Sequence, residues 1–249
     1  MTGPWQPPRP LTAAAWAGLV VLCLVGLFAA TARALHVDHL GEHMVPIRYR
    51  ILEAVGRQDR SNNAAEFARI DESFARYPAV TLLHVVPGGL FLLLAPLQLV
   101  RGIRRRFPAW HRWSGRALLV TGTVTALTGM FFGILMPFGG AGEALIIAIV
   151  GTLFLVAAFN AWRAIRRRDV TTDRRWMLRA FAVMLGVPLT RVIGTPIDIA
   201  FVGSGLAPGP VFVIDLWVAW AIAIGGAEWW IRRRRGATAE RLAGAALSG

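Results

Sequence analysis

Long apolar stretches alternate with short polar segments along the chain. Residues 11–32 contain no charged residue, and predominantly apolar stretches follow at about 77–100, 117–137, 143–162, 177–200 and 211–230. An α-helix rises about 1.5 Å per residue, so about 20 apolar residues cross the hydrocarbon core of a bilayer. The pattern therefore predicts an all-α, polytopic bundle of about six transmembrane helices.

The polar segments suggest how this bundle is divided. We expect an N-terminal transmembrane helix at 1–35, an extracytoplasmic polar segment at 36–76 with a surface helix near 64–74, a five-helix membrane core at 77–231 and a basic cytoplasmic tail at 232–249. Within the core, the arginine-rich segments 101–116 and 163–179 are expected to be loops. Glycine and proline predict further turns at 138–142 and 201–210.

Composition agrees with a membrane protein and gives its orientation. Hydrophobic residues make up 55% of the chain and charged residues only 16%, against about 25% in a typical soluble domain. The net charge is +13, but the basic residues, all arginine, gather in short clusters between apolar stretches. This is a topology signal and not the basic face of a nucleic-acid-binding module. We expect a bacterial inner-membrane protein with cytoplasmic termini, in contact with the lipid bilayer and with no nucleic-acid partner.

The first apolar stretch has two interpretations. Ala32-Arg33-Ala34 fits the small-x-small pattern of a signal-peptide cleavage site. The stretch is, however, longer than the usual apolar region of a signal peptide, which is about 7–15 residues. A retained helix is the preferred interpretation, and cleavage stays open.

Ionisable residues inside the apolar stretches are candidates for ligand binding, because charge within a bilayer is costly. His84, Arg191 and Asp215 are all predicted to lie in the extracytoplasmic half of the membrane. Arg191 keeps its proton and therefore needs a partner. Together these residues could bind an anionic or redox ligand. The alternative is an ion pair, for instance between Arg191 and Asp198, that only fixes helix packing.

A second group of candidates lies at the cytoplasmic rim. His111, Arg116 and Arg179 are predicted near helix ends, where guanidinium groups can bind a lipid phosphate, a nucleotide or a quinone-like carbonyl. The alternative is that these residues act only as topology signals and contact lipid headgroups.

A short histidine-rich segment follows the first apolar stretch. His36, His39 and His43 have the spacing of one helix face, and three imidazoles are a plausible zinc or copper ligand set. Gly41 weakens a helix here, and such segments also occur as ordinary protein surface. Two hypotheses therefore stand for these three histidines: they bind a metal ion, or they are part of an ordinary protein surface.

Catalytic motifs are scarce. The chain has no serine-centred nucleophile elbow and, without lysine, no phosphate loop of the usual type. Its one cysteine, Cys23, is predicted in mid-membrane. We therefore assign no catalytic residue, and a membrane-embedded enzyme stays open as a less favoured hypothesis.

Several motifs resemble those of one membrane-protein family. They are His84-x-x-x-Gly88-Gly89, Ala95-Pro96-Leu97-Gln98 followed by an arginine cluster, Pro108-x-x-His111-Arg112-Trp113-x-Gly115-Arg116, Arg175-Trp176-Met177-Leu178-Arg179 and Leu189-Thr190-Arg191. In this order, over about residues 80–200, they resemble the bacterial family called domain of unknown function 2306. The resemblance implies a membrane helix bundle and brings no established activity.

The chain departs from the family pattern at one position. Asp173 stands where the family usually has a histidine that would face the equivalent of His111, an arrangement similar to the bis-histidine ligation of b-type cytochromes. The resemblance therefore does not support a cytoplasmic-side haem in this chain. An outer haem b, held by His84 and one of the histidines at 36, 39 and 43, stays open.

These observations give three hypotheses for function. The first is a protein that binds a redox cofactor or a small anionic ligand in a polar bundle core. The second is a small-molecule or ion transporter, for which Pro188 and Pro196 would interrupt a helix. The third is a structural or assembly partner of a membrane complex. The sequence alone does not give the oligomeric state.

Overall fold

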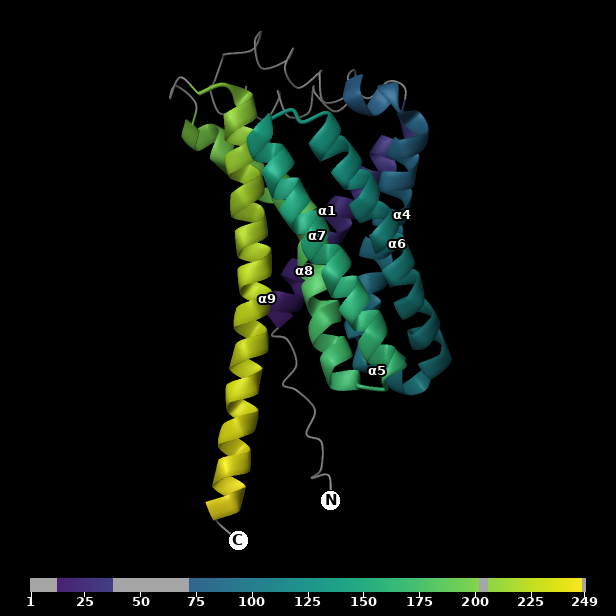
Figure 1. Ribbon diagram of the computed structural model, residues 1–249, viewed down its shortest axis with the longest axis vertical. Helices are drawn as coiled ribbons and strands as arrows, with labels where there is room; N and C mark the ends of the chain where they lie inside the picture. The colour runs from purple at the N-terminus through teal and green to yellow at the C-terminus, as the bar shows by residue number, and fades with distance from the viewer. Residues whose placement is uncertain (1–12, 38–71, 202–205, 248–249) are drawn as a thin grey trace.

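The computed structural model describes residues 13–37, 72–201 and 206–247, and all regular structure in these ranges is helical (Figure 1). Residues 72–76 are helical and lead into the second long helix. The remaining helices are α1 (Ala13–Leu35), α4 (Pro78–Leu99), α5 (Arg101–Arg106), α6 (Pro108–Leu135), α7 (Ala141–Arg166), α8 (Val170–Phe201) and α9 (Pro208–Leu247).

Six of these helices are long and apolar enough to cross a membrane: α1, α4, α6, α7, α8 and α9. This confirms the predicted all-α bundle with six candidate spans. Of the predicted surface helix near 64–74, only residues 72–74 belong to the described part of the chain, and they are helical.

The helices close into a ring. Each of α4, α6, α7 and α8 packs against the preceding long helix of the ring, and α1 packs against both α4 and α8. The sixth long helix, α9, lies outside this ring against α8, with fewer contacts to α7 (Figure 1). The N-terminal helix is therefore a wall of the bundle and not an appendage to it.

Both segments that we expected to be loops are largely helical, so this prediction is wrong. Residues 101–116 contain α5 and the first turns of α6, which begins at Pro108. Residues 163–179 contain the end of α7 and the first turns of α8. Arginine is a good helix former, and proline is favoured in the first turn of a helix. The helices therefore continue beyond the apolar stretches that define them, as α9 does through Leu247.

Only three residues join α7 to α8. Arg168 has a left-handed backbone with φ 58°, and the N–H of Asp169 donates to the carbonyl of Ala164 at 3.0 Å. Asp169 then caps α8, because its Oδ1 accepts from the N–H of Thr172 at 2.9 Å. Hydrogen bonds from the hydroxyl and then the N–H of Thr172 hold the pKa of this exposed carboxyl below its ordinary value.

Small residues allow the ring helices to approach closely. A Cβ on Gly26 of α1 would lie 2.6 Å from Pro188 of α8 and would also clash with Leu92 of α4. Gly122 of α6 leaves room in the same way for Phe154 of α7. Such contacts are typical of membrane helix interfaces, where backbones pack closely over small residues.

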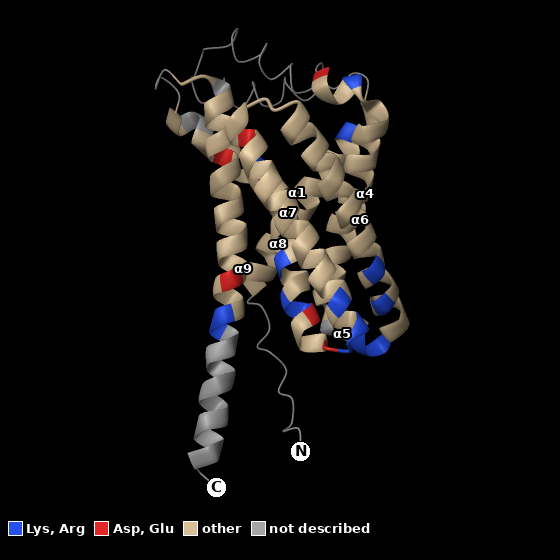
Figure 2. Ribbon diagram, viewed as in Figure 1, with Lys and Arg blue, Asp and Glu red and all other residues tan. Residues whose placement is uncertain are grey.

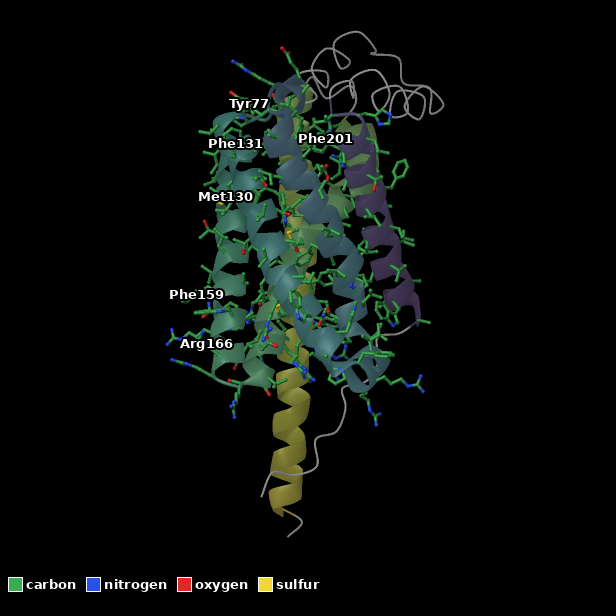
Figure 3. All side chains as sticks on the ribbon, turned by 90° about the vertical axis from the view of Figure 1, so that its right-hand side faces the viewer. Tyr77, Met130, Phe131, Phe159, Arg166 and Phe201 are labelled. Carbon is green, nitrogen blue, oxygen red and sulfur yellow. The ribbon has the colours of Figure 1, made fainter. Side chains whose placement is uncertain are left out.

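Charge is concentrated at one end of the bundle (Figure 2). We call this the arginine-rich end; it comprises residues 101–116, 163–179 and 228–233. The opposite end, which we call the arginine-poor end, contains the α6–α7 turn at 136–140 and the start of α9. The side-chain view places Arg166 at the first end and Tyr77, Phe131 and Phe201 towards the second (Figure 3).

Candidate functional site

His84 lies on α4 and its imidazole is held by α6. Nδ1 is 3.1 Å from the backbone carbonyl oxygen of Thr125 and 3.1 Å from Oγ1 of Thr128. A carbonyl oxygen can only accept, so Nδ1 carries the proton and donates to Thr125. The Thr128 hydroxyl itself donates to the carbonyl of Val124 at 2.7 Å, which leaves its oxygen free to accept from the ring.

Residues of α6 pack closely around the imidazole of His84. A Cβ on Gly129 would lie 3.0 Å from Cε1 of His84, so a larger residue there would require the imidazole to shift. The ring of Phe132 lies edge-on to the imidazole, with centroids 6.2 Å apart and an interplanar angle of 80°. One face of α6, with residues at 125, 128, 129 and 132, therefore fixes both the position and the tautomer of His84.

The second ring nitrogen of His84, Nε2, has no hydrogen-bond partner among the described residues. The His84 residue as a whole is only partly buried. With Nδ1 protonated, a neutral ring presents a lone pair at Nε2. This nitrogen can therefore ligate a metal or accept a hydrogen bond.

The other two predicted residues of the extracytoplasmic group lie on α8 and α9. Arg191 has an exposed side chain, whereas Asp215 is buried. A Cβ on Gly194 of α8 would lie 2.9 Å from Oδ2 of Asp215, so α9 brings this carboxyl directly against the α8 backbone. Between His84 and either residue, the described part of the structure shows no hydrogen bond or ion pair.

At the arginine-rich end, the end of α4 is tied to the start of α6. Gln98 Nε2 donates to the carbonyl oxygen of His111 at 3.1 Å and also to the Ser114 hydroxyl. The Ser114 hydroxyl in turn donates to the carbonyl of Trp110 at 2.7 Å. The Gln98 and Ser114 side chains thus fix the register between two helices.

His111 and Asp173 each have an enclosed polar atom without a hydrogen bond. These atoms are Nδ1 of His111 and Oδ1 of Asp173. The charge of Arg174 acts on both side chains. One imidazole, at the start of α6, and one carboxyl, at the start of α8, are thus influenced by the same arginine.

The two predicted arginines at this end have different surroundings. Arg179 forms an ion pair with Glu228 of α9, in which Nη2 lies 3.2 Å from Oε2 and Nε contacts Oε1. Its guanidinium also lies 4.6 Å from the ring centroid of Trp176. Arg116 is exposed on α6. Arg179 therefore joins α8 to α9, while Arg116 faces outwards.

Only the first histidine of the predicted metal site can be placed. His36 follows α1, and its Nδ1 lies 3.0 Å from the carbonyl oxygen of Ala32. His39 and His43 lie outside the described residues. The described ranges contain no group of three or more histidine, cysteine, aspartate or glutamate side chains that could hold a metal ion.

Sequence reasoning missed the partners of His84. Thr125, Thr128 and Gly129 lie on the same face of α6 as Phe132, and this spacing is visible in the sequence. Gly122 and Gly133 on the same helix instead allow close packing, against Phe154 and Ile147. The sequence signal for these partners is a pair of threonines, Thr125 and Thr128, next to Gly129 on the span that follows His84.

Six long apolar helices, with polar side chains between them, define a polytopic helical membrane protein. A family described as predicted membrane protein DUF2306 matches residues 81–231, and the chain belongs to this family. No curated protein matches the chain, and neither does any solved structure. The match covers α6, α7 and α8, nearly all of α4 and the membrane-spanning part of α9.

Proposed function

We propose that the protein binds a redox-active ligand, haem or a quinol, through Nε2 of His84. The observation that carries this proposal is the hydrogen bond from Nδ1 to the Thr125 carbonyl, at 3.1 Å. Such a bond on one ring nitrogen fixes the tautomer and orients the other nitrogen, as is usual for histidines that ligate metals.

The tautomer selects the chemistry of the ligand. A lone pair on Nε2 attracts an electron-pair acceptor, such as a haem iron, or a hydrogen-bond donor, such as a quinol hydroxyl. It repels an anion and the carbonyl oxygen of an oxidised quinone. Because His84 is only partly buried, a molecule dissolved in the membrane can approach its imidazole. An anionic ligand at His84 is therefore the less favoured version of the hypothesis.

The transporter hypothesis has less support. Helices that are unwound near a binding site are typical of many transporters. Here α8 is helical from Val170 to Phe201, through both Pro188 and Pro196. The two prolines nevertheless remove backbone donors, which leaves the carbonyls of Met184 and Val192 without their usual helical partners.

The distribution of charge supports a proposal for the orientation and the location of the bundle. We propose that the arginine-rich end faces the cytoplasm of a bacterial cell and that the bundle lies in the inner membrane. The clustering of arginine at one end (Figure 2) supports this through the positive-inside rule.

The ligand is tested on the full chain, purified in mild detergent from cells supplied with haem precursor. Absorption spectra of the oxidised and dithionite-reduced protein detect haem, and solvent extraction with mass spectrometry detects quinol. We expect one of the two in near-stoichiometric amount, lost in His84→Ala and kept in His111→Ala, the matched control at the other end. A protein with neither ligand, or equal loss in both variants, would overturn the proposal.

A further inference from the structure

An apolar pocket opens at the arginine-rich end, where α5 connects α4 to α6. Its volume is about 350 Å³, and it is lined by Leu97, Ile103, Phe107 and Trp110. These residues come from the end of α4, from α5, from the single residue between α5 and α6, and from the first turn of α6. The pocket is therefore made by one corner of the chain.

The surface around this pocket is aromatic and exposed. Phe107 is 61% exposed. Trp113, which lies about one turn beyond Trp110 on α6, is 72% exposed. Leaving side chains of this size in water is costly, whereas the interfacial region of a bilayer favours tryptophan. The pocket thus lies where a membrane lipid can cover it.

The charge of the same corner is strongly positive. Four of the six residues of α5 are arginine, and the side chains of Arg105, Arg106 and Arg112 are exposed. Between Glu72 and Glu143 the sequence contains no acidic residue. The three helices that build the corner therefore supply no carboxylate to balance these guanidinium groups.

Two carboxylates on the neighbouring helices have partners of their own. Glu228 pairs with Arg179, and Asp169 accepts from the N–H of Thr172. Asp173 feels the charge of Arg174, the next residue on its own helix. The exposed guanidinium groups of Arg105, Arg106 and Arg112 therefore offer a surface on which an anion can bind.

We propose that this corner binds an anionic glycerophospholipid, with an acyl chain in the pocket and the phosphate on the exposed guanidinium groups of Arg105, Arg106 and Arg112. Guanidinium groups bind phosphate with two parallel hydrogen bonds. A free phosphate would leave the apolar pocket empty, and a zwitterionic lipid would bring a cation towards the arginines. Of these three ligands, only the anionic lipid satisfies both parts of the site. This proposal does not depend on the ligand of His84.

The test uses the full chain, stripped of lipid in detergent and titrated by native mass spectrometry. The probes are phosphatidylglycerol and phosphatidylcholine with identical acyl chains, and inorganic phosphate as a competitor. We expect phosphatidylglycerol to bind at least about tenfold more tightly than phosphatidylcholine. Phosphate should compete only weakly.

Variants locate the site. Arg105→Gln combined with Arg106→Gln should reduce the preference for phosphatidylglycerol by about tenfold or more. The matched control is Arg166→Gln combined with Arg167→Gln, which removes the same charge from the same end and should leave the preference unchanged. Ile103→Asn should weaken the binding of both lipids. If the first pair does not fold, Arg112→Gln replaces it, with the same direction expected.

Three results would overturn the proposal. Equal affinity for the two lipids would remove the role of charge, and equal effects of the two arginine pairs would indicate a diffuse surface potential. Competition by inorganic phosphate at the same concentration as lipid would show a phosphate site without a lipid tail.

Discussion

The imidazole of His84 lies so close to Gly129 that a Cβ there would stand 3.0 Å from its Cε1 carbon. This contact joins α4 to α6 at the point where the Nδ1 hydrogen bond to Thr125 is made. The glycine is thus part of the histidine's environment, and changing it tests that environment without touching the imidazole.

We predict that Gly129→Ala lowers the stability of the protein by about 1–2 kcal/mol, because the new methyl group must displace a held ring. Thermal unfolding in detergent measures this change. Gly225→Ala on α9 is the matched control, since a Cβ there meets nothing within 4 Å. It should be neutral or slightly stabilising. Equal unfolding temperatures for the two variants would argue against a tight contact at His84.

The ion pair between Arg179 and Glu228 should couple α8 to α9. We predict that Arg179→Gln and Glu228→Gln each destabilise the protein and that the double variant loses less than the sum. A coupling free energy of about 1 kcal/mol is expected, because both side chains are partly exposed and solvent weakens the pair. The double-mutant cycle is measured by thermal unfolding, and strictly additive losses would contradict the prediction.

The cap of α8 predicts a pH dependence of stability. Hydrogen bonds from Thr172 lower the pKa of the Asp169 carboxyl in the folded protein. Its contribution to stability is therefore present above the ordinary carboxyl pKa, about 4, and is lost as the pH falls through the lower, folded value. We expect Asp169→Asn to keep the cap and to remove this contribution to the pH profile.

The matching variant is Asp169→Ala, which removes the cap as well as the charge. It should unfold at a lower temperature than Asp169→Asn at neutral pH, because the N–H of Thr172 loses its acceptor. Unfolding profiles recorded from pH about 3 to about 7 compare both variants with the unmodified chain. A profile for Asp169→Asn that overlays that of the unmodified chain would contradict the assigned role.

The proposed orientation is open to direct labelling. In a Cys23→Ser background, we place single cysteines at two exposed positions without changing charge, as Ala141→Cys and Thr171→Cys. An impermeant maleimide added to spheroplasts should label the cysteine at 141, whereas the one at 171 should react only after the membrane is permeabilised. The reverse pattern would show that the arginine-rich end faces outwards.

The sequence was sufficient for the number and approximate centres of the spanning helices, because twenty consecutive apolar residues have few other uses. It was misleading at helix ends. The arginine clusters at 101–116 and 163–179 were interpreted as loops, although Pro108 at a first turn and Asp169 before Val170 are both signals of helix starts. Charge locates the edge of the membrane, and a helix need not stop there.

The partners of His84 could not be predicted in the same way. Its depth in the membrane follows from counting along one helix, but its contact with Thr125 depends on the rotation and register of α6 against α4. Both are set by packing around residues such as Gly122 and Gly129, whose effect is read only when the helices are placed side by side. The ion pair of Arg179 was hidden for the same reason, since Glu228 lies on another span.

The position of α1 between α4 and α8 also constrains the order of events during synthesis. Gly26 meets Leu92 and Pro188, but Pro188 leaves the ribosome only after three further spanning helices have been made. One side of α1 must therefore face lipid or the insertion machinery until α8 has been inserted. Completion of the ring is thus a late step in biogenesis, and a nascent chain stopped before α8 would still be open on that side.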